Sequence, residues 1–108
     1  MSSQVLNLFV NEFGDPSNPH NGSAMQWNGG PANLYAWPSG SMSLTAKVQI
    51  SLDGGTTWFD SGTSISVSSP GEFQPGFSQP SIMVRGVMGP NYPGSSSLNL
   101  RLVGYDGT

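Results

Sequence analysis

Residues 43–60 read SLTAKVQISLDGGTTWFD, and this stretch decides the fold class. Over 43–51 an apolar side chain stands at every second position, which is the period of two that buries one face of a β-strand. Residues 52–55, Leu-Asp-Gly-Gly, then interrupt the alternation with residues suited to a tight turn. The sequence therefore predicts a β-hairpin whose second strand covers 56–60.

The same alternation occurs near the C-terminus. Leu98, Leu100 and Leu102 stand at every second position of 97–105, so we expect them to face a core. The residues expected to face outward from that strand are Asn99, Arg101 and Val103. No segment shows the i, i+3, i+4, i+7 spacing of a buried helix face over a useful length. Further strands are predicted over 4–10, 33–37, 63–67 and 81–87, of which the first two have weaker patterns.

Glycine and proline mark long loops between these strands. The chain has 15 glycines and 9 prolines, and the predicted loops are 11–22, 68–80 and 89–96. Short strands separated by turn signals are typical of sandwiches and jelly rolls. We therefore predict an all-β fold, a β-sandwich or jelly-roll-like barrel of about seven to eight short strands. It forms one domain over 1–108, in which 1–11 is an N-terminal arm or an edge strand.

The composition is poor in charge. Only 8% of the residues are Asp, Glu, Lys or Arg, against about 25% in an ordinary soluble domain. Six acidic and three basic residues give a net charge of −3. Nucleic-acid binding and docking on an anionic membrane both depend on clustered cations, so we expect neither nucleic acid nor membrane as a partner.

The chain has no cysteine, which excludes disulfides, thiolate nucleophiles and cysteine metal ligands. Its first residues, Met-Ser-Ser-Gln, lack the basic and apolar regions of a signal peptide. No segment approaches the ~20 apolar residues that a transmembrane helix needs. We expect a soluble protein made in the cytoplasm.

One motif is specific. Residues 51–58, SLDGGTTW, match the pattern Ser-x-Asp-x-Gly-x-Thr-Trp, which is called an Asp-box. A carboxylate at Asp53 can accept backbone N–H groups of the turn, Gly55 can take a positive φ, and Trp58 can pack against the turn. The motif resembles the hairpin brace of sialidases and other propellers, where it lies away from catalysis. We expect a structural turn; the alternative is that Asp53 also helps to bind an ion. The turn residues are Ser51, Asp53, Gly55, Thr57 and Trp58.

The aromatic residues allow two interpretations. They can form a stacking platform for sugar rings, or they can fill a small core and its rims. Trp27 and Trp37 stand beside Gly/Pro-rich segments and are the ones we expect to be most exposed. The full set for a platform is Trp27, Tyr35, Trp37, Trp58 and Tyr105.

The residues of common active sites are few. A glycosidase needs two carboxylates paired across a cleft, and most carboxylates here stand in predicted turns or loops. His20 is the only histidine, so neither a Ser-His-Asp triad nor a histidine-rich metal site is expected. Asp15, Asn18 and Asn21 carry oxygens that could ligate Ca²⁺, but they do not match an EF-hand loop, and we expect an ordinary Asx-turn there instead. We predict no enzyme activity, no metal site and no cofactor.

Three segments carry a wider resemblance. The WNGG segment at 27–30, the hairpin at 51–58 and the ending SLNLRLVGY at 97–105 are similar to small virion proteins of tailed bacteriophages. The chain resembles capsid decoration, or cement, proteins, which bind the outside of the head and stabilise it. The resemblance implies a place on the capsid surface of the virion. It implies the major capsid protein and copies of the chain itself as partners, with a trimer as one arrangement.

Under this hypothesis, large apolar side chains in Gly/Pro-rich segments are interface candidates. Such residues have few reasons within the chain to be there. The candidates are Trp27, Trp37, Phe73, Phe77 and Tyr92. The alternative functions are a carbohydrate-binding module, with a glycan as ligand, and a fibre or tail adhesion component.

Overall fold

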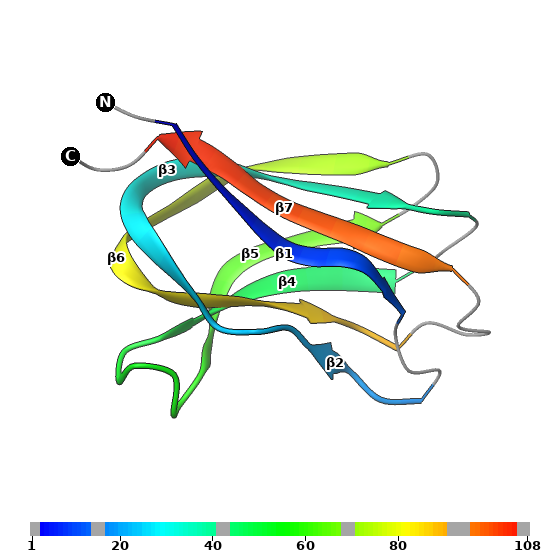
Figure 1. Cartoon of the computed structure of the whole chain (residues 1–108), viewed down its shortest axis with the longest axis horizontal. Helices are drawn as coiled ribbons and strands as arrows, with labels where there is room; N and C mark the ends of the chain where they lie inside the picture. The colour runs from blue at the N-terminus through cyan, green and yellow to red at the C-terminus, as the bar shows by residue number, and fades with distance from the viewer. Residues whose placement is uncertain (1–2, 14–16, 41–43, 68–70, 91–95, 106–108) are drawn as a thin grey trace.

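Figure 1 shows the computed structural model of the chain, which confirms the all-β prediction. The structure describes residues 3–13, 17–40, 44–67, 71–90 and 96–105. Every regular element in these ranges is a strand. The strands are β1 (Ser3–Phe13), β2 (His20–Asn21), β3 (Met25–Pro38), β4 (Leu44–Ser51), β5 (Phe59–Val67), β6 (Glu72–Met88) and β7 (Ser97–Tyr105).

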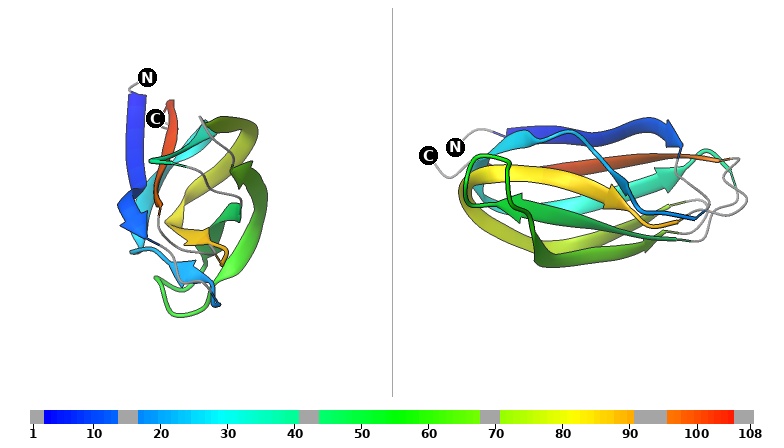
Figure 2. Two further views of the ribbon diagram at one scale, coloured as in Figure 1. Left: turned by 90° about the vertical axis from the view of Figure 1, so that its right-hand side faces the viewer. Right: turned by 90° about the horizontal axis from the view of Figure 1, so that it is seen from below.

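The strands form one antiparallel sheet in the order β1-β7-β3-β6-β4-β5, and β2 pairs with β6 beside this path. β3 and β6 are long and central. The first half of β3 pairs with the second half of β6, in a register that joins Trp27 to Ile82. The second half of β3 lies between β7 and the first half of β6. Its Tyr35 pairs with Arg101 of β7 on one side and with Phe73 of β6 on the other. The sheet therefore folds over on itself into a flattened, barrel-like sandwich (Figure 2).

The fold-over depends on a bend that β3 and β6 share. In Figure 1 both strands curve at the left-hand end of the molecule. Gly29, Gly30 and Gly76 stand in this region with φ angles of 90°, 106° and 97°, which glycine adopts without steric cost. A Cβ on Gly29 would lie 3.2 Å from the backbone nitrogen of Ser81. The bend therefore requires glycine both for its dihedral angle and for the close approach of the paired strand.

Trp27 and Phe77 fill the inside of this bend. Their rings meet edge to face, with centroids 5.6 Å apart and planes at 84°. The Trp27 indole N–H donates to the carbonyl oxygen of Gly30 over 3.3 Å, so the ring is held against the bend itself. Both side chains are buried in the core of the chain. The prediction that Trp27 is exposed is wrong: the segment around it is rich in glycine because the strand bends there, not because it is a loop.

The predicted loop over 68–80 is also wrong from residue 72 onward, where β6 begins. Pro75 stands at the register shift between the pairs of Ala32 and Leu34. Pro80 stands between the paired residues Gln79 and Ser81. Within the described residues, this half of β6 pairs only with β3, because β4 begins to pair at Met83. Prolines are tolerated where a strand has a bulge or a free edge, since no ladder hydrogen bond is lost.

The remaining boundaries shift in smaller ways. The predicted strands 56–60 and 63–67 are one strand, β5, which begins at Phe59 because 52–58 form the turn. The predicted strand 33–37 is the second half of β3. The N-terminal segment is an edge strand, since β1 pairs with β7 at one end of the sheet. Part of the predicted loop 89–96 lies outside the described residues, which omit 91–95.

The core lies between the two layers. Leu98, Leu100 and Leu102 are fully buried, as their alternation predicts. Leu44, Ala46 and Val48 of β4 face them from the other layer of the sandwich, again as predicted. The outward faces of the same strands are therefore the surfaces available for function.

Two phenylalanines of β6 allow a test of which side chains belong to the core. Phe77 is 1% exposed and Phe73 is 58% exposed. We expect Phe77→Ala to lower the free energy of unfolding by about 3–5 kcal/mol, because it opens a cavity beside Trp27. Phe73→Ala, on the same strand, should cost about 1 kcal/mol or less, since its ring only stacks on Tyr35. Urea unfolding of the two variants measures both values. Equal losses would contradict the assignment of Phe77 to the core.

Candidate functional site

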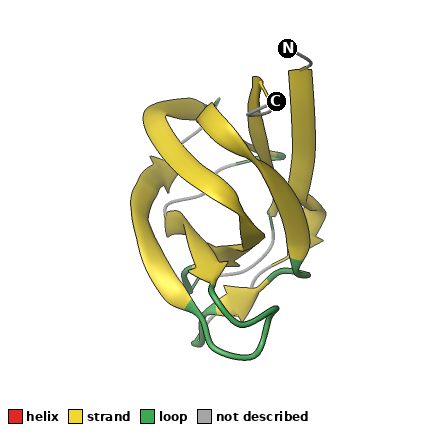
Figure 3. Cartoon of the chain, turned by 90° about the vertical axis from the view of Figure 1, so that its left-hand side faces the viewer, coloured by secondary structure: helices red, strands yellow, loops and turns green. Residues whose placement is uncertain are grey.

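The Asp-box hairpin between β4 and β5 projects from one end of the sandwich (Figure 3). One carboxylate oxygen of Asp53, Oδ1, accepts hydrogen bonds from the Ser51 hydroxyl at 2.8 Å and from the Thr56 and Thr57 N–H groups at 3.1 and 2.8 Å. The Gly55 N–H donates to the Ser51 hydroxyl, and Gly55 has a φ of 111°. The expected carboxylate-centred turn is therefore confirmed.

These hydrogen bonds stabilise the ionised form of the carboxylate. Donation by the Thr57 backbone, and next by the Ser51 hydroxyl, holds the pKa of Asp53 well below its ordinary value of 3.8. Trp58 closes the turn as expected, because its indole N–H donates to the Gly55 carbonyl oxygen at 3.1 Å. The geometry accounts for the residues of the motif as a structural brace.

The hairpin connects to a polar network on the outer face of β4, β5 and β6. The Arg85 guanidinium lies over the Trp58 ring, 4.5 Å from its centroid, and its Nε donates to Gln49 at 2.9 Å. Gln49 in turn donates to Asp60 at 2.9 Å, and Lys47 lies 3.0 Å from the same carboxylate. The hydrogen bonds from Gln49 and Lys47 lower the pKa of Asp60. On this layer Lys47 and Asp60 therefore pair with each other, and Arg85 is held by Gln49 and Trp58.

The opposite layer presents a different surface, which we call the aromatic face. It consists of the outward side chains of β1, β7, the second half of β3 and the first residues of β6. Register pairs place these side chains in rows across the sheet. Val103 lies between Val5 and Asn33, and Tyr35 lies beside Phe73. The residues of the aromatic face are Val5, Asn7, Asn33, Tyr35, Trp37, Phe73, Asn99, Arg101 and Val103.

Contacts within the aromatic face order its side chains. The Tyr35 and Phe73 rings stack at 5.8 Å, with planes 25° apart. The Arg101 guanidinium lies over the Trp37 ring, 5.2 Å from its centroid. Arg101 is the one cation among the described residues of the face, and its Nε donates to Asn7 at 2.8 Å. Glu72 lines a groove with Tyr35, Trp37 and Phe73 at the edge of the face. The face is therefore a mostly apolar surface with amide groups and a single cation.

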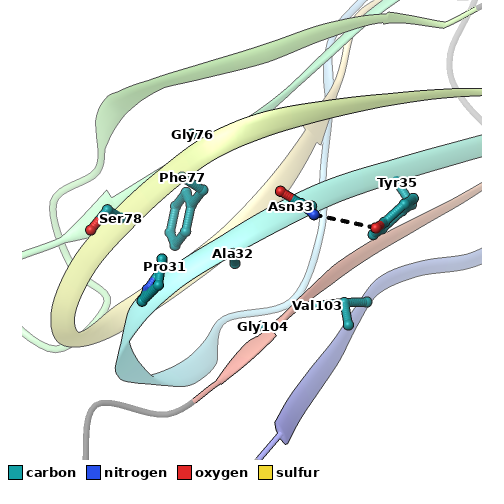
Figure 4. Close-up of a pocket in the computed structure, with 9 residues that line it drawn as sticks. All are labelled: Pro31, Ala32, Asn33, Tyr35, Gly76, Phe77, Ser78, Val103 and Gly104. Carbon is teal, nitrogen blue, oxygen red and sulfur yellow. Dashed lines mark hydrogen bonds between the residues drawn. The ribbon is translucent and has the colours of Figure 1, made fainter.

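A shallow hollow of about 440 Å³ borders this face (Figure 4). Asn33, Tyr35 and Val103 form one side of it, and Phe77 forms its floor from the core. The Asn33 amide donates to the Tyr35 hydroxyl at 3.3 Å, the bond drawn in Figure 4. The hollow offers an apolar surface with a few polar groups at its rim, which is the usual character of a contact site.

The structure separates the interface candidates into three groups. Trp37, which is 37% exposed, and Phe73 lie on the aromatic face. Trp27 and Phe77 are buried in the core of the same chain, so the expectation that they lack partners within the chain is wrong. Tyr92 lies outside the described residues.

The sugar-platform set is divided in the same way. Tyr35 and Trp37 share the aromatic face, whereas Trp27 is in the core and Trp58 belongs to the hairpin brace on the opposite layer. The side chain of Tyr105 lies outside the described part of the chain. A five-ring platform is therefore wrong, and of the four members whose side chains the structure describes only Tyr35 and Trp37 lie together.

The residues that could support catalysis or metal binding lie apart. Among residues 3–13, 17–40, 44–67, 71–90 and 96–105, no three His, Asp or Glu side chains are grouped as a metal site requires. His20 Nε2 lies 2.9 Å from the Glu12 carboxylate oxygen Oε2, and its ring stacks on Phe9 with centroids 5.8 Å apart. Asp15, one of the candidate calcium ligands, lies outside the described residues. The described ranges contain no helix that is long and apolar enough to cross a membrane.

Comparison with protein-family models and with curated proteins finds no match to this chain. The aromatic face is thus assigned from its own residues. The sequence already places Asn99, Arg101 and Val103 on the outward side of β7, but it gives no sign that Asn7, Asn33 and Phe73 lie beside them. Strand order supplies that information, because β1 and β7 are neighbours in the sheet although they stand at opposite ends of the chain.

The Asp53 brace gives a pH-dependent prediction. A carboxylate whose pKa is lowered in the folded state stabilises the fold above its unfolded-state pKa of about 3.9 and loses that effect as the pH falls through its folded-state pKa. We expect Asp53→Asn to lower the melting temperature at neutral pH, because the turn loses its charged acceptor. The difference from the wild type should stay constant from about pH 8 to pH 5 and shrink below about pH 4. Thermal melts across this range measure it. A difference that does not change with pH would contradict the role of the ionised carboxylate.

Proposed function

We propose that this chain is a non-enzymatic structural protein of a bacteriophage virion, a capsid decoration subunit that binds the outside of the head. The aromatic face carries this proposal. Exposed apolar side chains on β1, β3 and β6 gather on one side of the sandwich, where Val5, Trp37 and Phe73 surround a single cation. Contiguous apolar surface with aromatic residues and few charges is characteristic of the centre of protein interfaces.

The chemistry of the whole surface supports the same proposal. With 8% charged residues, most contacts of this chain are apolar or made by neutral hydrogen-bonding groups. Such contacts depend little on screened Coulomb interactions. Many copies on one shell also reinforce each other geometrically. The partners proposed for the aromatic face are therefore the major capsid protein and neighbouring copies of the chain.

Carbohydrate binding is the second candidate, on a free module or on a fibre or tail component. The observation in its favour is that Tyr35 and Trp37 stand two residues apart on one outward face, beside the Asn33 amide. Sugar rings stack on open ring faces. Here Phe73 covers one face of Tyr35, and Arg101 covers one face of Trp37. The rings are thus partly occupied by neighbours, which favours decoration over a glycan platform.

Co-sedimentation tests the proposal. Heads of the phage that carries this gene, prepared without the protein, are mixed with the purified chain and pelleted. We expect the wild type to pellet with the heads at a fixed ratio to the capsid protein. Phe73→Ala should weaken binding by about tenfold, the equivalent of about 1.4 kcal/mol for a well-placed interface aromatic.

Phe59→Ala is the matched control, because Phe59 is a similarly exposed phenylalanine on β5, outside the aromatic face. It should bind like the wild type. Failure of the wild type to pellet with the heads would overturn the proposal, and a glycan array would then test the second candidate. Equal losses from both phenylalanine variants would contradict the assignment of the contact to the aromatic face.

A further inference from the structure

One row of the aromatic face crosses three strands. The register places Asn7 of β1 beside Arg101 of β7, and Arg101 beside Tyr35 of β3. Asn7 and Arg101 are exposed and Tyr35 is half-buried. These three side chains carry the strongest hydrogen-bonding groups near the centre of the face.

Each oxygen acceptor of this row already accepts one hydrogen bond from a neighbouring side chain. Asn7 Oδ1 accepts from Arg101 Nε at 2.8 Å. The Tyr35 hydroxyl oxygen accepts from the Asn33 amide at 3.3 Å (Figure 4). Both groups therefore face the neighbouring side chains with their oxygen atoms.

Several hydrogen-bond donors of this row have no partner within the described residues. Within the described residues, neither Nη atom of Arg101 nor the amide nitrogen of Asn7 has a hydrogen-bond partner. The proton of the Tyr35 hydroxyl is also available, because its oxygen acts as the acceptor toward Asn33. A row whose unpaired donors include the two Nη groups of a guanidinium complements an anionic acceptor.

Arg101 is also held in position. Its Nε is fixed by Asn7, and its plane lies over Trp37, so its two Nη groups are the free edge of the guanidinium. That edge matches the two oxygens of a carboxylate in a bidentate pair. Because the side chain is ordered before binding, less conformational entropy is lost when the pair forms.

We propose that the aromatic face recognises a carboxylate, an Asp or Glu side chain on the surface of a protein partner, through Arg101, with Asn7 and Tyr35 as additional donors. The inference rests on the proposed function, because it specifies the chemistry of the surface that the decoration subunit contacts. Charge complementarity identifies the occupant: a single cation among neutral groups matches one carboxylate.

The surroundings favour a protein over other anions. Val5, Val103 and Phe73 border the row, so the partner's carboxylate stands among apolar side chains. Such a border excludes water and strengthens the ion pair. A polyanion would need several cations in one row, and Arg101 is the one cation among the described residues of the face.

Arg85 provides a matched control for Arg101. Each arginine lies over a tryptophan ring, at 4.5 Å for Arg85 and 5.2 Å for Arg101. Each also donates its Nε to a side-chain amide, Gln49 for Arg85 and Asn7 for Arg101. Arg85 stands on the opposite layer, so Arg85→Gln removes the same contacts and the same charge from the other side of the molecule.

The experiment compares Arg101→Gln, Arg85→Gln and Asn7→Asp with the wild type for co-sedimentation with the heads described above, after thermal melts establish that each variant is folded. Arg101→Gln should bind at least about tenfold more weakly, as loss of one member of a buried charge pair predicts. Asn7→Asp should weaken binding comparably, because its own carboxylate occupies Arg101. Arg85→Gln should stay within about twofold of the wild type.

Three outcomes would overturn the inference. If the wild type binds and both Arg101→Gln and Asn7→Asp bind equally well, the carboxylate contact is wrong while the decoration function stands. If the wild type does not bind the heads, the proposed function fails and this inference with it. If Arg101 is needed for binding a uronic-acid polymer but not for binding heads, the carboxylate belongs to a glycan rather than to a protein. If Arg101→Gln fails to fold, Asn7→Asp alone decides, since it changes one exposed side chain.

Discussion

The shared bend of β3 and β6 is the constraint on which the rest of the structure depends. It turns one antiparallel sheet back on itself, so that the strand order β1-β7-β3-β6-β4-β5 closes over a single core. Glycines with positive φ at 29, 30 and 76 permit the bend. The edge-to-face contact of Trp27 and Phe77 fills its inside. Both rings belong to the same buried cluster as Val48 and Leu100, which come from the two layers.

The two outer surfaces follow from that architecture and differ in chemistry. The layer of β4, β5 and β6 holds an ion pair between Lys47 and Asp60, and its Arg85 donates to Gln49 and lies over the hairpin residue Trp58. The layer of β1, β7 and β3 leaves apolar side chains and the Arg101 guanidinium open. Each layer carries one arginine–tryptophan pair, and in both pairs the guanidinium Nη groups have no hydrogen-bond partner among the described residues. The layers differ in what surrounds the arginine, which is a polar network around Arg85 and mostly apolar side chains around Arg101.

Local patterns predicted the parts of the fold that local chemistry controls. The alternation at Leu98, Leu100 and Leu102 identified β7 and its buried side, and the motif at 51–58 identified the turn with its carboxylate acceptor. Both depend on residues within a few positions of one another. The lack of helical spacing among the apolar residues likewise predicted a fold without helices.

Long-range pairing set the features that these patterns missed. Pro75, Gly76 and Pro80 predict a loop when each is considered alone, but the paired strand bends at the same place and makes 72–80 a strand. Trp27 and Phe77 are buried for the same reason, although their glycine- and proline-rich neighbours suggested exposure. The aromatic face combines residues from 5 to 103, and only the neighbouring positions of β1, β7 and β3 bring them together. No local rule reveals which strands are neighbours.

A cryo-electron microscopy map of heads incubated with the chain tests the central claim most directly, because it shows which side of the sandwich contacts the capsid. We predict density for the chain on the outer surface of the head, with β1, β7 and the second half of β3 against the capsid protein or a neighbouring copy. A map in which the β4–β5 layer makes the contact and the aromatic face lies in solvent would contradict the claim, and so would heads without added density.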